Sequence, residues 1–64
     1  MSTQDQDIVR ARIDVWRKRL LEAQEDGNAV VEARYGDVLY GVRRVLADLG
    51  FDELAAAASL VDQT

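Results

Sequence analysis

Apolar residues recur every three or four positions in two successive stretches of the chain, which is the spacing of one face of an α-helix. The seam of the first stretch consists of Val9, Ile13, Trp16, Leu20 and Ala23. The seam of the second consists of Val31, Tyr35, Val38, Val42, Val45 and Leu49, and is widened by Leu39 and Leu46. Two such seams in neighbouring segments are typical of helices that pack against each other.

Residues that favour helix ends mark the limits of these two helices. Thr3 and Gln6 have the spacing of a capping box, which satisfies free backbone N–H groups at a helix start. Gly27 suits the left-handed end of the first helix, and Asn28 can cap the second. The sequence therefore predicts helices at residues 4–26 and 29–49, and the short turn between them favours an antiparallel hairpin.

A short third helix is expected after the second. Gly50 can end the second helix, and Phe51 can fold back on Leu46. Asp52 can then cap a helix at residues 53–61. The apolar face of that helix consists of Leu54, Ala58 and Val61.

The expected fold is one all-α domain spanning residues 1–64, which forms a three-helix bundle or half of a dimeric four-helix-type bundle. Gly36 and Gly41 lie inside the second helix, where each costs about 1 kcal/mol relative to Ala. The alternative is a β-hairpin turning at Gly36 and Asp37, which would abandon six correctly spaced positions.

Composition limits both the stability and the location of the protein. A 64-residue chain has a marginal core, and this one has neither Cys nor His to strengthen it with disulfides or a metal site. Self-association, as a homodimer, is the remaining route. No apolar run is long enough to cross a membrane, and the acidic N-terminal segment does not resemble a secretory signal, so we expect a cytoplasmic protein. Seven Arg against one Lys is typical of a GC-rich bacterial or phage genome.

Catalytic chemistry is not expected. General acid–base and nucleophilic catalysis draw mainly on His, Cys or an activated Ser, and no base is evident beside the Ser residues. The sequence also lacks a glycine-rich phosphate loop and the clustered ligands of a metal site. We therefore predict no enzyme, no catalytic residue, no cofactor and no metal.

Arginines border the seam of the first helix on both sides. Arg10 and Arg17 are expected to be ordinary solvated residues that pair with nearby carboxylates such as Asp14. Arg12 and Arg19 lie beside Ile8 and Val15 in a second apolar stripe that needs a covering partner. On the second helix, small residues away from the seam would allow another backbone to approach closely. The predicted partner-binding residues are Ile8, Arg12, Val15, Arg19, Ala33, Gly36, Leu39, Tyr40 and Leu46.

A helical hairpin of this size with paired heptad seams is similar in layout to the Rop family, small plasmid RNA-binding proteins that dimerise into four-helix bundles. The resemblance covers the first two helices and includes no motif beyond the heptads. The net charge of −4 and the third helix depart from that pattern, so no residue role is transferred.

The expected function is that of a small non-enzymatic helical interaction module, which regulates, adapts or inhibits another protein and self-associates. The alternative is a nucleic-acid-binding regulator that uses the arginine-flanked first helix. Net acidity disfavours that alternative, because binding to phosphates needs a concentrated basic surface.

Overall fold

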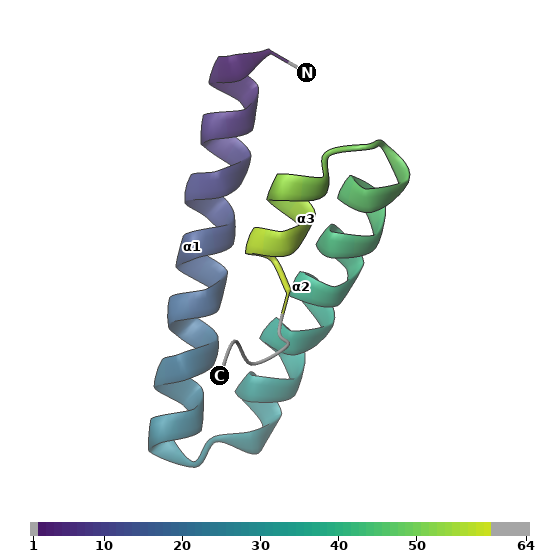
Figure 1. Cartoon of the computed structure of the whole chain (residues 1–64). Coiled ribbons are helices and arrows are strands. Elements are labelled where there is room, and N and C mark those ends of the chain that lie inside the picture. The colour runs from purple at the N-terminus through teal and green to yellow at the C-terminus, as the bar shows by residue number, and fades with distance from the viewer. Residues whose placement is uncertain (1, 60–64) are drawn as a thin grey trace.

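The computed structural model describes residues 2–59, which form three helices and no strand (Figure 1). These are α1 (Thr3–Asp26), α2 (Ala29–Asp48) and α3 (Asp52–Ala57). The prediction of an all-helical protein with two long helices and a short third one is confirmed. The alternative β-hairpin is wrong, because α2 continues without a break through Gly36. The predicted bounds of the third helix, 53–61, are wrong: α3 ends at Ala57, and neither Ala58 nor Ser59 is helical. Residues 60 and 61, the second of which is Val61 of the predicted apolar face, lie outside the described residues.

The first helix begins one residue earlier than the capping pattern predicted. Ser2 has an extended backbone, and its Oγ accepts a hydrogen bond of 3.1 Å from the backbone N–H of Asp5. The backbone carbonyl of Ser2 also accepts a bond of 2.9 Å from the N–H of Gln6. The prediction that Thr3 caps the helix is therefore wrong, since Thr3 is already its first residue.

The turn between α1 and α2 forms as its residues predict. Gly27 has a φ of 71°, and the N–H of Asn28 donates a bond of 2.9 Å to the carbonyl of Ala23. The side-chain oxygen of Asn28 accepts a bond of 3.2 Å from the N–H of Val31, which caps α2. In Figure 1 the chain reverses at this turn, and α2 returns alongside α1.

A second left-handed glycine ends α2. Gly50 has a φ of 87°, and the N–H of Phe51 donates a bond of 2.9 Å to the carbonyl of Leu46, the pattern of a Schellman motif. Phe51 packs against the core, as predicted. The prediction that Asp52 caps α3 is wrong, because Asp52 is the first residue of that helix and no side chain bonds to its free N–H groups.

The core lies where the three helices meet. Its buried residues are Ile13, Leu20, Ala23, Leu39, Leu46, Leu54, Ala55 and Ala58. Partly buried side chains packed around them are Val9, Trp16, Tyr35, Val42, Phe51 and Ala57. Two of the three helices contribute most of the large side chains, and α3 adds Leu54 and small alanines that let it approach both neighbours closely.

The buried face of α2 differs from the predicted seam. Val45 and Leu49 were expected inside, but they are 58% and 62% exposed, whereas Leu39 and Leu46 are 0% and 5% exposed. Leu39 and Val45 are six residues apart, which at 100° per residue is a rotation of about 240° beyond one full turn. The two side chains therefore lie about 120° apart around the helix. The presence of α3 explains the difference, because α2 turns its leucines toward the region between α1 and α3.

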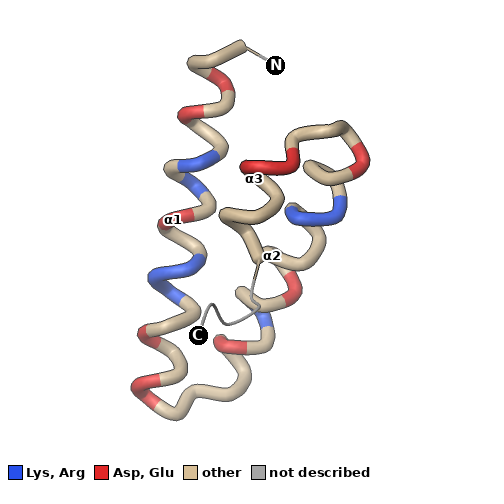
Figure 2. Tube along the Cα trace, in the orientation of Figure 1, with Lys and Arg blue, Asp and Glu red and all other residues tan. Residues whose placement is uncertain are grey.

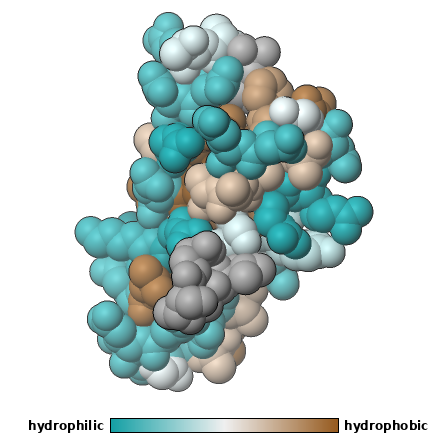
Figure 3. Space-filling model, in the orientation of Figure 1, coloured by the Kyte–Doolittle hydropathy of each residue, from teal (hydrophilic) through white to brown (hydrophobic). Residues whose placement is uncertain are grey.

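The third helix covers one side of the α1–α2 pair. In Figure 1 the ribbons of α1 and α2 separate with distance from their turn, and α3 lies between them there. Figure 3 views this side: hydrophilic side chains predominate along α1, and paler apolar ones lie over α3. Within residues 2–59, no helix combines the length and apolar character needed to cross a membrane.

Candidate interaction surface

An open apolar groove of about 630 Å³ lies between α1 and α2. Eight of its ten lining residues are apolar or glycine, and the two charged ones come from opposite walls. The lining residues are Ile8, Val9, Arg12 and Trp16 on α1, and Asp37, Val38, Gly41, Val42, Val45 and Leu46 on α2. No residue of α3 takes part.

The groove lies on the side of the helix pair that α3 leaves uncovered. Arg17 faces α3, because it forms hydrogen bonds with backbone carbonyls at the end of that helix. Arg12 lies five residues before Arg17, which places the two side chains about 140° apart around α1. The α1–α2 pair therefore has one face packed against α3 and one face open.

Exposed apolar side chains extend the groove on both helices. Ile8 is 60% exposed and Val15, seven residues further along the same face of α1, is 45% exposed. On α2, Val45 and Leu49 are likewise exposed and lie one turn apart. Large contiguous apolar patches on small proteins mark contact sites more often than isolated apolar residues do.

The arginines of α1 divide between the two faces. In Figure 2 two basic segments lie in the middle of α1 with an acidic position between them, and acidic residues also lie toward both ends of the helix. Arg17 is half-buried, and its Nη1 donates bonds of 2.9 Å to the carbonyl of Ala57 and 2.6 Å to that of Ser59. The expectation that Arg17 is an ordinary solvated residue is therefore wrong. Arg10 also lies on the α3 side, whereas Arg12 lines the groove. Arg19 lies seven residues after Arg12, about 20° away around the helix, and therefore on the same side of α1.

The structure brings together only part of the predicted partner-binding set. Ile8, Arg12 and Leu46 line the groove, and Val15 and Arg19 continue the same exposed stripe of α1. Leu39 has no exposed surface, and Leu46 is almost fully buried although one edge of it reaches the groove. Leu39 and Leu46 were predicted to bind a partner from the surface of α2, but both pack in the chain's own core.

The small-residue strip of α2 lies away from the groove. Ala33 is exposed and Gly36 is half-buried, on the side of α2 turned from Val38 and Val45. Tyr40 is 52% exposed, and the guanidinium groups of Arg43 and Arg44 lie 5.4 and 6.0 Å from its ring centroid. Arg44 also donates a bond of 3.2 Å to the Tyr40 hydroxyl, so neighbours on its own helix already contact this ring.

The periodicity places several groove residues in the core. Trp16, Val38, Val42 and Val45 all belong to the predicted seams, yet each also lines the open groove. The spacing of apolar residues indicates which of them share a face of a helix. It does not indicate how much of that face the neighbouring helices bury. Gly41 is the residue in the sequence that could have pointed to this surface, because glycine is unfavourable inside a helix. In the structure, a methyl group added to Gly41 would meet nothing within 4 Å.

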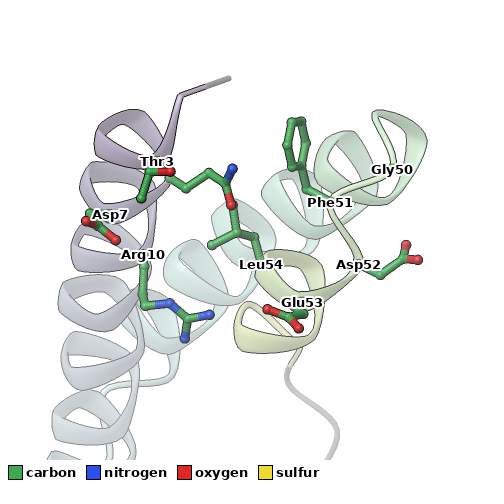
Figure 4. Close-up of a pocket in the computed structure, with 9 residues that line it drawn as sticks. Thr3, Asp7, Arg10, Gly50, Phe51, Asp52, Glu53 and Leu54 are labelled. Atoms are coloured by element: carbon green, nitrogen blue, oxygen red, sulfur yellow. The ribbon is translucent and has the colours of Figure 1, made fainter.

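A second hollow, of about 360 Å³, lies between the start of α1 and the α2–α3 turn. Figure 4 shows Asp7 and Arg10 on the α1 side of it, and Phe51, Asp52 and Glu53 on the other. The Arg10 guanidinium extends toward the side that bears Glu53. All four charged side chains are exposed to solvent, which lowers the strength of any ionic contact they make.

The described residues contain little chemistry beyond packing. Within residues 2–59, no group of three or more Asp or Glu side chains is placed to hold a metal ion, and no polar or charged residue is buried. Comparison with protein-family models, with curated proteins and with solved structures finds no match to this chain. The interpretation of the surface therefore depends on its own geometry.

Proposed function

We propose that the protein is a small non-enzymatic helical interaction module that regulates, adapts or inhibits another protein through the α1–α2 groove. In this proposal α1 and α2 are an antiparallel pair, α3 covers one side of them, and the other side is the working surface. The three-helix arrangement supports a rigid surface of this kind without a cofactor or a catalytic group.

The single observation that supports the proposal is the open apolar groove, with its exposed shoulders Ile8 and Val45. Burying apolar surface stabilises a complex by about 25 cal/mol for each Å² removed from water. A groove between two helices also matches the shape of an apolar helix face, which is a recurring mode of protein recognition. A protein surface is therefore the occupant that fits best.

The arrangement of the arginines does not favour nucleic-acid binding. Phosphates are bound best by cations gathered on one face. Here Arg17 is engaged by backbone carbonyls on one side of α1, while Arg12 and Arg19 lie toward the other side. Protein binding is accordingly the function we propose.

The test is site-specific photo-crosslinking of the full chain in its native host. A benzophenone amino acid replaces Val45, which is in the groove and 58% exposed, or Tyr40, which is 52% exposed and on the side of α2 away from the groove. We expect discrete protein adducts from position 45, unchanged by nuclease treatment, and none of the same adducts from position 40.

Two results would contradict the proposal. Equal adducts from both positions would mean that contacts are made without regard to the groove. Adducts from position 45 that disappear with nuclease would instead identify nucleic acid as the bound partner.

A further inference from the structure

We propose that the groove face binds a second copy of this chain, with the twofold axis parallel to the helices and α1 of each copy lying over α2 of the other. This inference rests on the groove identified above as the working surface, and it names the occupant that covers the groove while no other protein is bound there. The size of the face, the shapes along it and the positions of its charges all support a second copy.

The size of the face fits a pair of helices better than a single helix. The molecule measures at most 37 by 22 Å, so a flat face covers no more than about 800 Å². Each partner in a stable interface of standard size buries about 800 Å². A single helix is about 10 Å wide, so it can lie in the groove but leaves about half of a face 22 Å wide uncovered. A second α1–α2 pair covers the whole width.

The shapes match under this twofold arrangement. A rotation about an axis parallel to the helices keeps every residue at its own height along them. Val15 lies twelve residues before Gly27, and Gly41 lies thirteen residues after Asn28, so the two are at nearly equal heights on opposite helices. The exposed Val15 of one copy therefore meets the side-chain-free surface of Gly41 in the other.

The charges match at the next position along the same stripes. Arg19 lies eight residues before Gly27, and Asp37 lies nine residues after Asn28. Each copy has a cation on α1 at the height where it has an anion on α2, and both side chains are exposed. The twofold thus pairs Arg19 of each copy with Asp37 of the other, which gives two equivalent contacts across one interface.

Gly41 also has no explanation within a single copy. It lies inside α2 with an ordinary helical backbone, where glycine weakens a helix, and a methyl group added to it meets nothing within 4 Å. Close approach by a second chain provides a reason for a glycine there.

The first measurement is sedimentation equilibrium combined with fluorescence of Trp16, the only tryptophan and a groove residue. We expect the mass to rise from 7.1 kDa to twice that value with concentration, and acrylamide quenching of Trp16 to fall over the same range. A mass of one chain at every concentration up to the millimolar range, with constant quenching, would overturn the inference.

The decisive measurement uses charge reversal. Arg19→Asp places two acidic side chains opposite each other at both contacts, and Asp37→Arg does the same with two basic ones. We expect each variant alone to dimerise about tenfold more weakly than the wild type, since exposed pairs are individually modest. An equimolar mixture of the two variants should regain the wild-type affinity, because each contact then joins opposite charges. Failure of the mixture to recover would contradict the proposed pairing.

A matched pair of variants tests the contact at Gly41. Gly41→Leu puts a side chain into the proposed interface, whereas Ala33→Leu puts one on an exposed surface of α2 away from the groove. We expect Gly41→Leu to abolish the dimer while far-ultraviolet circular dichroism and the melt of dilute protein keep the fold intact. Ala33→Leu should dimerise as the wild type does, and the opposite order would overturn the arrangement.

The two proposals fail in distinguishable ways. If the chain is monomeric but position 45 still crosslinks to another protein, the proposed function holds and the second copy is the wrong occupant. If position 45 crosslinks only to the chain itself, the dimer holds and regulation of another protein through this groove is wrong.

Discussion

The guanidinium of Arg17 on α1 donates a hydrogen bond of 2.9 Å to the backbone carbonyl of Ala57, the last residue of α3. The last carbonyls of a helix have no partner within it, and they form its negative end. The half-buried Arg17 donates a hydrogen bond to one of these carbonyls and brings a positive charge to the negative end of α3. Because α3 has only six residues and no side-chain cap at its start, we expect the bond from Arg17 to contribute to its packing against α1.

Replacing Arg17 with Met should therefore loosen α3 while keeping the apolar stem of the side chain. We expect the free energy of unfolding to fall by about 1.5–3 kcal/mol, the range for hydrogen bonds that involve a charged group. The matched control is Lys18→Met, which removes an exposed cation from the next position. Urea denaturation followed by circular dichroism measures both, and equal losses would show that α3 does not depend on Arg17.

Truncation of two leucines of α2 should lower the stability of the protein by very different amounts. Leu39 has no exposed surface, so Leu39→Ala should cost about 2–5 kcal/mol and unfold much of the protein at room temperature. Leu49 is 62% exposed, so Leu49→Ala should cost less than about 0.5 kcal/mol in dilute protein. Thermal melts at low concentration compare the two. A larger cost at Leu49 would restore the seam that the periodicity predicted.

The start of α1 gives a test between adjacent hydroxyl residues. Ser2→Ala removes the oxygen that accepts from Asp5 and should lower stability by about 0.5–1 kcal/mol. Thr3→Ala changes the first helical residue and should leave stability the same or slightly higher. Chemical denaturation of the two variants, side by side with wild type, decides between them; a loss at Thr3 alone would reinstate the capping box.

Two glycines should respond with opposite sign to the same substitution. Gly50 has a φ of 87°, so Gly50→Ala should destabilise by about 1–2 kcal/mol through backbone strain. Gly41 has a helical backbone and open space around it, so Gly41→Ala should stabilise dilute protein by about 0.5–1 kcal/mol. Melting temperatures of both variants provide the measurement. Destabilisation by alanine at position 41 would mean that α2 is distorted there.

The helices and their ends follow from local chemistry, which is why the sequence predicts them well. Gly27 and Asn28 act through their own backbone and side-chain bonds within a few residues, and the same is true of Gly50 and Phe51. The error at Thr3 is one of a single position, since Ser2 offers the same hydroxyl chemistry one residue earlier.

The candidate surface could be predicted only in part. Ile8, Arg12, Val15 and Arg19 were identified on α1 because their stripe lies outside the helix's main seam. On α2 the prediction placed the buried leucines at the surface and the groove valines in the core. A repeat of three and four residues gives the relative angles of side chains around a helix, but not the direction in which the helix faces.

The sequence by itself determined three helical segments, their turns and one exposed stripe of α1, because each depends on residues near one another along the chain. Only the tertiary structure decided the orientation of α2 and the role of Arg17. Both depend on where α3 packs: it draws Leu39 and Leu46 inward, presents its terminal carbonyls to Arg17, and leaves the opposite face open. That position arises from contacts between residues up to 42 apart along the chain, which no local pattern encodes.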